Sequence, residues 1–166
     1  MKKYLFFILL TPLYASAQDT PISAFLIKWE NSKNYLLEIA EAMPEEFYDY
    51  KPSERQMSFE EQLLHIQSNM NWLGSTYFKQ KKVSKKTEYF TKETLIVYLR
   101  ESFKAIEEVV KNIPDEALKE QVEFFAGKKS KLQILNLLQD HVTHHRGQLV
   151  VYLNLKNIKP PRYSGW

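Results

Sequence analysis

Residues 130–155 read SKLQILNLLQDHVTHHRGQLVVYLNL, and this stretch decides the fold. Ser130 and Gln133 have the spacing of a capping box, in which two side chains satisfy free backbone N–H groups at the start of a helix. One face of the predicted helix then recurs at steps of three and four, and its members are Ile134, Leu138, His141, His145, Gln148 and Tyr152. The spacing predicts an amphipathic helix that begins at Ser130 and ends before Pro160.

Three earlier stretches have the same periodicity. The first spans 22–43, contains neither Gly nor Pro, and is closed by Pro44. The second begins at Ser58, which starts another capping box, and the third begins near Thr91 and is ended by Pro114. The chain therefore reads as four amphipathic helices.

Four such helices bury their apolar faces most simply in a four-helix bundle. We therefore predict an all-α fold, a single bundle domain over 18–166 with short irregular connections. The connections 44–57 and 114–129 are longer than a hairpin turn, which predicts at least one crossover or a few short extra elements. One of these is a short strand within 120–125, where the sequence EQVEFF alternates loosely.

The composition agrees with one soluble helical domain. Of the 166 residues, 44% are hydrophobic and 26% are charged, as in ordinary globular proteins. Only four are glycine, which argues against a β-sandwich or barrel because tight turns consume glycine. No cysteine is present, and this excludes disulfides, thiolate metal sites, iron–sulfur clusters and a cysteine nucleophile.

The first residues have the pattern of a secretory signal peptide. A basic start at Met1–Lys3 precedes the apolar run 4–14 and the small residues 15–17. The alternative is a membrane anchor, but a spanning helix needs about 20 apolar residues, more than this run offers. We predict a signal peptide over 1–17 and a periplasmic or secreted mature protein that begins at about Gln18.

The charge gives no reason to expect nucleic acid or an anionic membrane as a partner. The net charge of +3 falls to +1 when Lys2 and Lys3 are removed with the signal peptide. A basic cluster over 79–86 lies between two helical patterns without interleaved aromatics, which is typical of a solvated loop.

The histidines carry the chemical signal. His141 and His145 are four residues apart, so they project from one helix face and can bind one metal ion together. His65, on the second helix, is the remaining candidate for a third ligand, and three histidines leave an open position of the kind found in catalytic zinc sites. His144 could be a fourth ligand, a donor to a ligand, or a packed or exposed residue, and we favour a role other than ligand. The alternative for the whole cluster is core packing.

Other classes of metal site and enzyme are excluded, because the residues that they require are missing. A di-iron carboxylate site needs Glu-x-x-His pairs on two helices, and the fourth helix has no glutamate. Covalent haem needs cysteines, the His-Glu-x-x-His motif of zincins is missing, and no nucleophile elbow marks a serine hydrolase.

Two segments carry a family resemblance. The stretch 140–148 (DHVTHHRGQ), closing with 159–166 (KPPRYSGW), resembles the DinB-like superfamily, also known as the YfiT-like metal-dependent hydrolases. The segments 49–52 and 58–66 resemble its second-helix block, so that the resemblance covers about 22–166.

The resemblance implies a four-helix bundle with a non-sequential helix order and a divalent metal, often zinc or nickel. It also implies that His65, His141 and His145 are the metal ligands. Some relatives are thiol-dependent transferases or isomerases. The signal peptide departs from the common pattern, and because cytosolic thiols are scarce outside the cytoplasm, it speaks against that activity here.

Three functions follow as hypotheses: a metal-dependent hydrolase or transferase, a non-catalytic metal or small-ligand binding bundle of the cell envelope, and an interaction domain with packed histidines. No residue stands out as a general base. We favour Zn²⁺, which neutral imidazole suits, and the ligand types do not distinguish it well from Ni²⁺. We expect a small-molecule substrate, no nucleic acid and no stable membrane insertion; a homodimer is an oligomeric state to test. Candidates for the surroundings of the metal are Asn69, Asp140, Gln62, Trp72 and Arg146.

Overall fold

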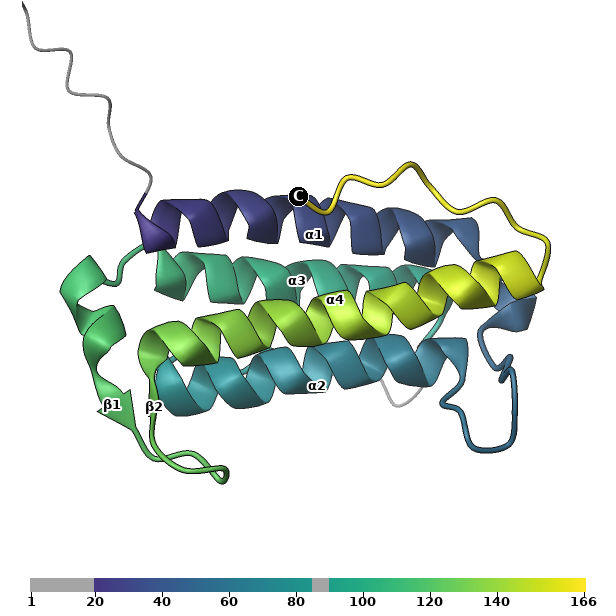
Figure 1. Cartoon of the computed structure of the whole chain (residues 1–166). Coiled ribbons are helices and arrows are strands. Elements are labelled where there is room, and N and C mark those ends of the chain that lie inside the picture. The colour runs from purple at the N-terminus through teal and green to yellow at the C-terminus, as the bar shows by residue number, and fades with distance from the viewer. Residues whose placement is uncertain (1–19, 85–89) are drawn as a thin grey trace, which may run out of the picture.

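Four helices dominate the computed structural model, which describes residues 20–84 and 90–166 (Figure 1). Their bounds are α1 Pro21–Ala42, α2 Phe59–Tyr77, α3 Lys92–Val110 and α4 Lys131–Leu155. The all-α four-helix prediction is confirmed. The predicted signal peptide lies outside the described residues. Among the helices that are described, none is long and apolar enough to cross a membrane.

Local side-chain caps explain where the helices start. The hydroxyl of Ser58 accepts from the backbone N–H of Glu61, whose carboxylate accepts from the Ser58 N–H. Ser130 and Gln133 form the same reciprocal pair at the start of α4, so both predicted capping boxes are confirmed. Thr91 caps α3 in the same way.

The helices do not pack in sequence order. α1 packs against α3 and α4, and α2 packs against the same two, so that α1 lies diagonally across from α2. The Lys92 ammonium at the start of α3 donates to the carbonyls of Glu41 and Met43 at the end of α1, which makes these two helices antiparallel. The Tyr77 hydroxyl at the end of α2 donates to the Glu123 carbonyl, just before the start of α4. Hence α2 and α4 are also antiparallel.

The connections contain short elements, as one of the two sequence alternatives predicted. The first holds the 3-10 helix Glu45–Phe47; the last holds the 3-10 helix Asp115–Lys119 and a hairpin of β1 Gln121–Val122 and β2 Lys129–Ser130. The predicted strand within 120–125 is thus confirmed at two residues. The long crossover lies elsewhere, between α2 and α3, where Val83 accepts a hydrogen bond from Asn71 of α2.

The core is formed by the predicted apolar faces. Trp29 is almost fully buried; its indole N–H donates to the Phe103 carbonyl at 3.0 Å, joining α1 to α3. Some of the buried polar groups pair across helices, as Gln139 does with Ser32 at 2.8 Å. Apart from tyrosines, the ionisable side chains buried in the described part of the chain are His145, which belongs to the histidine cluster, and Arg146.

After α4 the chain turns back and runs along α1 (Figure 1). Gly165 is buried against the Arg146 guanidinium, so close that an added Cβ would lie 2.6 Å from Nη2. The side chain of Asn31 donates to the carbonyl of Trp166 at 2.6 Å. This terminal segment, residues 157–166, therefore covers the seam between α1 and α4.

Candidate metal centre

The antiparallel packing of α2 and α4 brings three imidazoles together. His65 lies in the second turn of α2, and His141 and His145 lie in the middle of α4. The Nε2 atoms of His65 and His141 are 3.1 Å apart, and the His65 and His145 ring centres are 4.6 Å apart. The helical spacing of four explains why His141 and His145 face the same neighbour.

The cluster fits a divalent ion by geometry. Two nitrogen ligands at about 2.05 Å from a tetrahedral zinc lie about 3.3 Å apart, close to the His65–His141 separation of 3.1 Å. One ligand atom from each histidine lies within 4.8 Å of the others, so the third ring needs only a modest shift to close the triangle. The donor set is all imidazole, which suits Zn²⁺ and Ni²⁺.

Electrostatics keep two of these rings in the form that binds metal. Burial, reinforced by the neighbouring histidines, lowers the pKa of His141 to about 4. Burial and the charges of His65 and His144 lower the pKa of His145 to about 4 as well. A ligand must be deprotonated to bind, so these two rings are ready for metal at neutral pH. They also stay neutral well below pH 6.5, the ordinary pKa of a histidine.

Gln62 fixes the orientation of His145. Its Oε1 lies 2.5 Å from Nδ1 of His145, and its Nε2 donates to Oε1 of Gln148 at 2.7 Å and to the Tyr152 hydroxyl at 3.3 Å. Because the amide oxygen can only accept, Nδ1 of His145 carries the hydrogen and Nε2 keeps its lone pair for a ligand role. Such partners orient metal-binding histidines in many proteins.

His144 lies outside the cluster of three. It is exposed, and its Nε2 is 2.9 Å from Nε2 of Gln148 at the outer end of the same hydrogen-bond chain. The group of possible ligands contains the other three histidines and not His144. This placement agrees with the preference for a role other than ligand.

His141 has an unsatisfied nitrogen. Its Nδ1 is buried and has no hydrogen-bond partner among the described residues. Asp140, a candidate from sequence, does not supply one: it is exposed and lines two hollows that exclude the histidines. If Nε2 of His141 is the metal ligand, the neutral ring carries its hydrogen on Nδ1. Nδ1 is then a buried hydrogen-bond donor without an acceptor in the described part of the chain.

A pocket of about 500 Å³ opens onto His65 and His141. Its walls are mostly apolar, and it is lined by Ser68, Asn69, Trp72, Phe124, Phe125, Leu137 and the two histidines. Trp72 and Asn69 were candidates from sequence, and both lie here. Phe124 and Phe125 were missed, because only the docking of the hairpin onto α2 brings them near; their doublet in an otherwise polar connection was the available signal.

Arg146 is not part of this site, contrary to its selection as a candidate. Its side chain faces α1, where the guanidinium lies 5.1 Å from the centre of the Tyr35 ring and under Gly165. Burial lowers its pKa from the ordinary value, and Nη1 has no hydrogen-bond partner among the described residues. The residue anchors the terminal segment rather than the metal.

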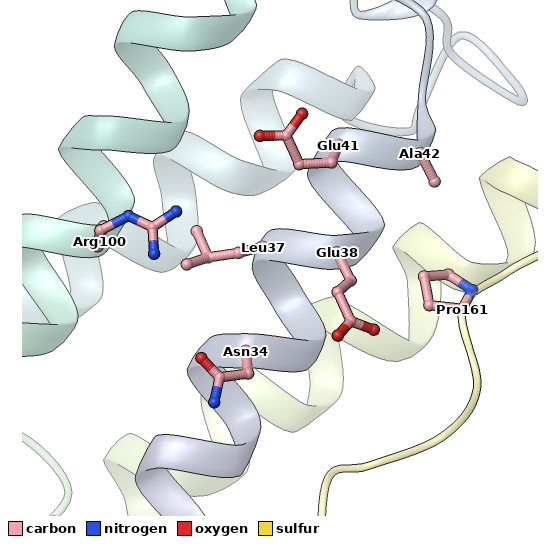
Figure 2. Close-up of a pocket in the computed structure, with 7 residues that line it drawn as sticks. All are labelled: Asn34, Leu37, Glu38, Glu41, Ala42, Arg100 and Pro161. Carbon is pink, nitrogen blue, oxygen red and sulfur yellow. The ribbon is translucent and has the colours of Figure 1, made fainter.

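A second hollow, of about 550 Å³, lies on the outer face of α1 (Figure 2). Its polar groups are Asn34, Glu38, Glu41 and Arg100, all of them exposed. Figure 2 shows Asn34, Glu38 and Glu41 spread along α1, with Arg100 on the neighbouring helix α3, rather than converging on one point. Nothing here matches the convergence of the three histidines, which remain the best candidate for chemistry.

Comparisons with known proteins support the fold. The Bacillus subtilis protein YjoA, which is uncharacterised, is 27% identical over 126 residues, or 73% of this chain and 81% of its own. A crystal structure of this DinB-like protein has a TM-score of 0.71 at 23% identity, covering 85% of this chain and 97% of that one. A DinB-like protein from Bacillus cereus ATCC 10987 has a TM-score of 0.72 at 19% identity, covering 84% and 95%.

These two structures share the fold with the chain. At their low sequence identity, the comparison supports the fold and not a function. The sequence model of the DinB family matches residues 16–163, nearly the full length. The match includes all four helices and the three clustered histidines. The chain belongs to the DinB family.

Proposed function

We propose that this protein is an exported metal-dependent enzyme, a hydrolase or transferase that acts on a small molecule. His65, His141 and His145 would hold the ion, with Zn²⁺ favoured and Ni²⁺ the alternative. One observation carries the proposal: the three imidazoles converge at the end of a pocket of about 500 Å³, which opens onto two of them. Three protein ligands leave a coordination position open, as catalytic sites require.

The chain's own residues have distinct roles in this proposal. The ion would supply Lewis-acid chemistry, polarising a substrate oxygen or making water more acidic. Gln62 holds the hydrogen of His145 on Nδ1, and Gln148 and Tyr152 hold Gln62. The apolar walls of the pocket would hold the apolar part of a substrate next to the ion.

A second candidate is a protein that binds metal or a small ligand without chemistry. It is favoured by one observation: apart from the histidines, the residues that line the pocket include no side chain that commonly acts as a general base. A metal-activated water does not require such a base, so we rank the enzyme first. The two candidates share the metal site and differ only in turnover.

Metal content tests both candidates. The mature protein, purified without a histidine tag and exposed to Zn²⁺ and Ni²⁺, should contain about one ion per chain by mass spectrometry. Replacing His65, His141 or His145 by Ala should each remove most of it, because two imidazoles hold an ion far less tightly than three. His144→Ala is the matched control, an exposed histidine on the same helix, and it should retain the metal.

Two results would contradict this proposal. If the wild-type protein takes up no metal under any condition, the histidines are core-packing residues and not ligands. Stoichiometric metal in the double variant His141→Ala/His145→Ala would place the site elsewhere.

Turnover separates the enzyme from the binding protein. The metal-loaded protein should hydrolyse at least one member of a panel of activated esters, amides and epoxides, or transfer its group to a thiol, and His141→Ala should not. Full metal occupancy with no turnover across the panel would favour the binding protein.

The proposed export has its own test. N-terminal sequencing of the protein from the cell envelope should begin at or near Gln18. Intact Met1 in a cytoplasmic fraction would contradict export and leave the metal site untouched.

A further inference from the structure

The mouth of the pocket is aromatic. Trp72 of α2 is 41% exposed, and its ring is stacked with the rings of Phe124 and Phe125, at centre distances of 6.0 and 6.3 Å. Phe125 is 83% exposed, the most open large apolar side chain among the described residues. Aromatic surface left open to solvent beside a cluster of potential ligands is unusual for core packing and typical of binding.

The hairpin that carries these rings is held at its base. The strands pair Gln121 with Ser130 and Val122 with Lys129, and the Tyr77 hydroxyl donates to the Glu123 carbonyl at 3.2 Å. Gly127 has a φ of 87°, a left-handed conformation that lets the tip turn without strain. The two phenylalanines are therefore presented from a fixed support.

Charge is kept out of this pocket. Its lining contains no lysine, arginine, aspartate or glutamate. The nearest charged groups in the lining of an adjacent hollow are Lys129 and Asp140, and Phe124 and Leu137 line both hollows and so form the wall between them. A charged ligand would lose its hydration here without gaining an opposite charge.

Besides the histidines, two polar side chains interrupt the apolar lining, Ser68 and Asn69. The Oδ1 atom of Asn69 is buried and has no hydrogen-bond partner among the described residues. Asn69 is one helical turn from His65 on α2, so it lies on the same face as that histidine. A rotation of the Asn69 side chain would turn this unpaired oxygen toward the pocket, where the N–H group of a ligand that reaches the histidines would satisfy it.

We propose that the natural ligand of the metal centre is a neutral aromatic compound whose ring stacks on Trp72 and Phe125 and whose polar end, bearing an N–H, reaches the three histidines. Aryl amides and related aromatic acyl compounds have this chemistry. The inference rests on the proposed function, because the polar end is placed at the metal. It adds to that function the substrate class, which the histidines alone do not define.

Two hydroxamic acids test the inference, because both offer the same metal-binding group with an N–H. Benzohydroxamic acid adds an aromatic ring, and acetohydroxamic acid has only a methyl group. Calorimetry with the zinc-loaded mature protein should show that benzohydroxamic acid binds at least tenfold more tightly. Trp72→Ala and Phe125→Ala should each reduce this preference severalfold, because they should weaken binding of benzohydroxamic acid more than that of acetohydroxamic acid.

Controls distinguish this inference from the proposal beneath it. Trp166→Ala, which removes another exposed tryptophan far from the pocket lining, should leave the preference intact. A 4-carboxy derivative of benzohydroxamic acid should bind at least tenfold more weakly than the parent. Equal binding of the two hydroxamic acids, or a preference that survives both aromatic substitutions, would overturn the aromatic ligand and leave the metal centre standing. Protein that retains no zinc and binds neither acid would overturn the proposed function and this inference together.

Discussion

Replacing Gln62 by Leu should weaken metal binding although all three histidines are still present. Leucine fills a similar volume but cannot accept the hydrogen of His145, whose Nδ1 lies 2.5 Å from the Gln62 oxygen. His145 is only 8% exposed, so the freed N–H finds little water. The ring then loses both its orientation and the polarisation that strengthens it as a ligand.

The expected magnitude follows from two separate arguments. A buried donor left without a partner costs about 1–3 kcal/mol. Loss of a hydrogen-bond partner behind a metal-binding histidine typically reduces affinity about 10–100-fold, which is about 1.4–2.8 kcal/mol. The two ranges overlap, and we expect a loss of at least tenfold in zinc affinity for Gln62→Leu. Gln62→Glu should match or exceed wild type, because a carboxylate accepts the same hydrogen and makes the imidazole a stronger donor to the ion.

The assay is a competition titration of zinc against a chromophoric chelator of known affinity. Gln67→Leu is the matched control. Gln67 is the same residue type on the same helix and is about equally buried. Its side chain donates to the Ser102 hydroxyl, at a distance of 3.1 Å, and does not contact the histidines. It should lower stability but leave zinc affinity within about twofold of wild type. Equal zinc affinities for wild type and Gln62→Leu would refute the argument that Gln62 orients His145.

Two further predictions concern stability. In the metal-free protein, His141 and His145 have folded pKa values of about 4 against about 6.5 when unfolded, so the unfolded chain takes up protons first as the pH falls. The contribution of these two histidines to stability should therefore be lost between pH 6.5 and 4, by up to roughly 3 kcal/mol per histidine. Urea unfolding should show the loss in the wild type, and the double variant His141→Gln/His145→Gln should have a flatter pH dependence in that window. Gly74→Ala should destabilise the fold by about 1–3 kcal/mol, because its Cβ would lie 2.5 Å from Cδ1 of Ile106. Gly147→Ala, at a helical position with nothing within 4 Å, should instead stabilise it by about 0.5–1 kcal/mol, and equal urea midpoints for the two variants would contradict the packing argument.

The features predicted well from sequence are those that depend on local chemistry. Ser58 and Ser130 mark helix starts because each needs only a partner three residues away. The spacing of His141 and His145 places them on one face for the same reason. His65 was selected as the remaining histidine and through the family resemblance, and the packing of α2 against α4 brings it to the pair.

The features that were missed depend on distant segments. Phe124 and Phe125 meet Trp72 across about fifty residues of chain, and nothing in the local pattern gives the direction of the hairpin. Arg146 follows His145 directly, which made it a candidate for the site, yet adjacent helical residues point about 100° apart and it faces α1 instead. The long crossover between α2 and α3 contains neither Gly nor Pro over 79–90, so the sequence offers no turn signal from which its path could be predicted.

The diagonal arrangement of the helices has a consequence for the order in which the chain can fold. A helical hairpin of α1 with α2, or of α3 with α4, would not be native, because neither pair is in extensive contact in the finished bundle. α1 must wait for α3 and α4, so its native contacts join segments far apart in the sequence. Topologies of this kind fold more slowly than up-and-down bundles of the same size. For an exported chain, as proposed here, such slowness would favour passage across the membrane before the bundle forms.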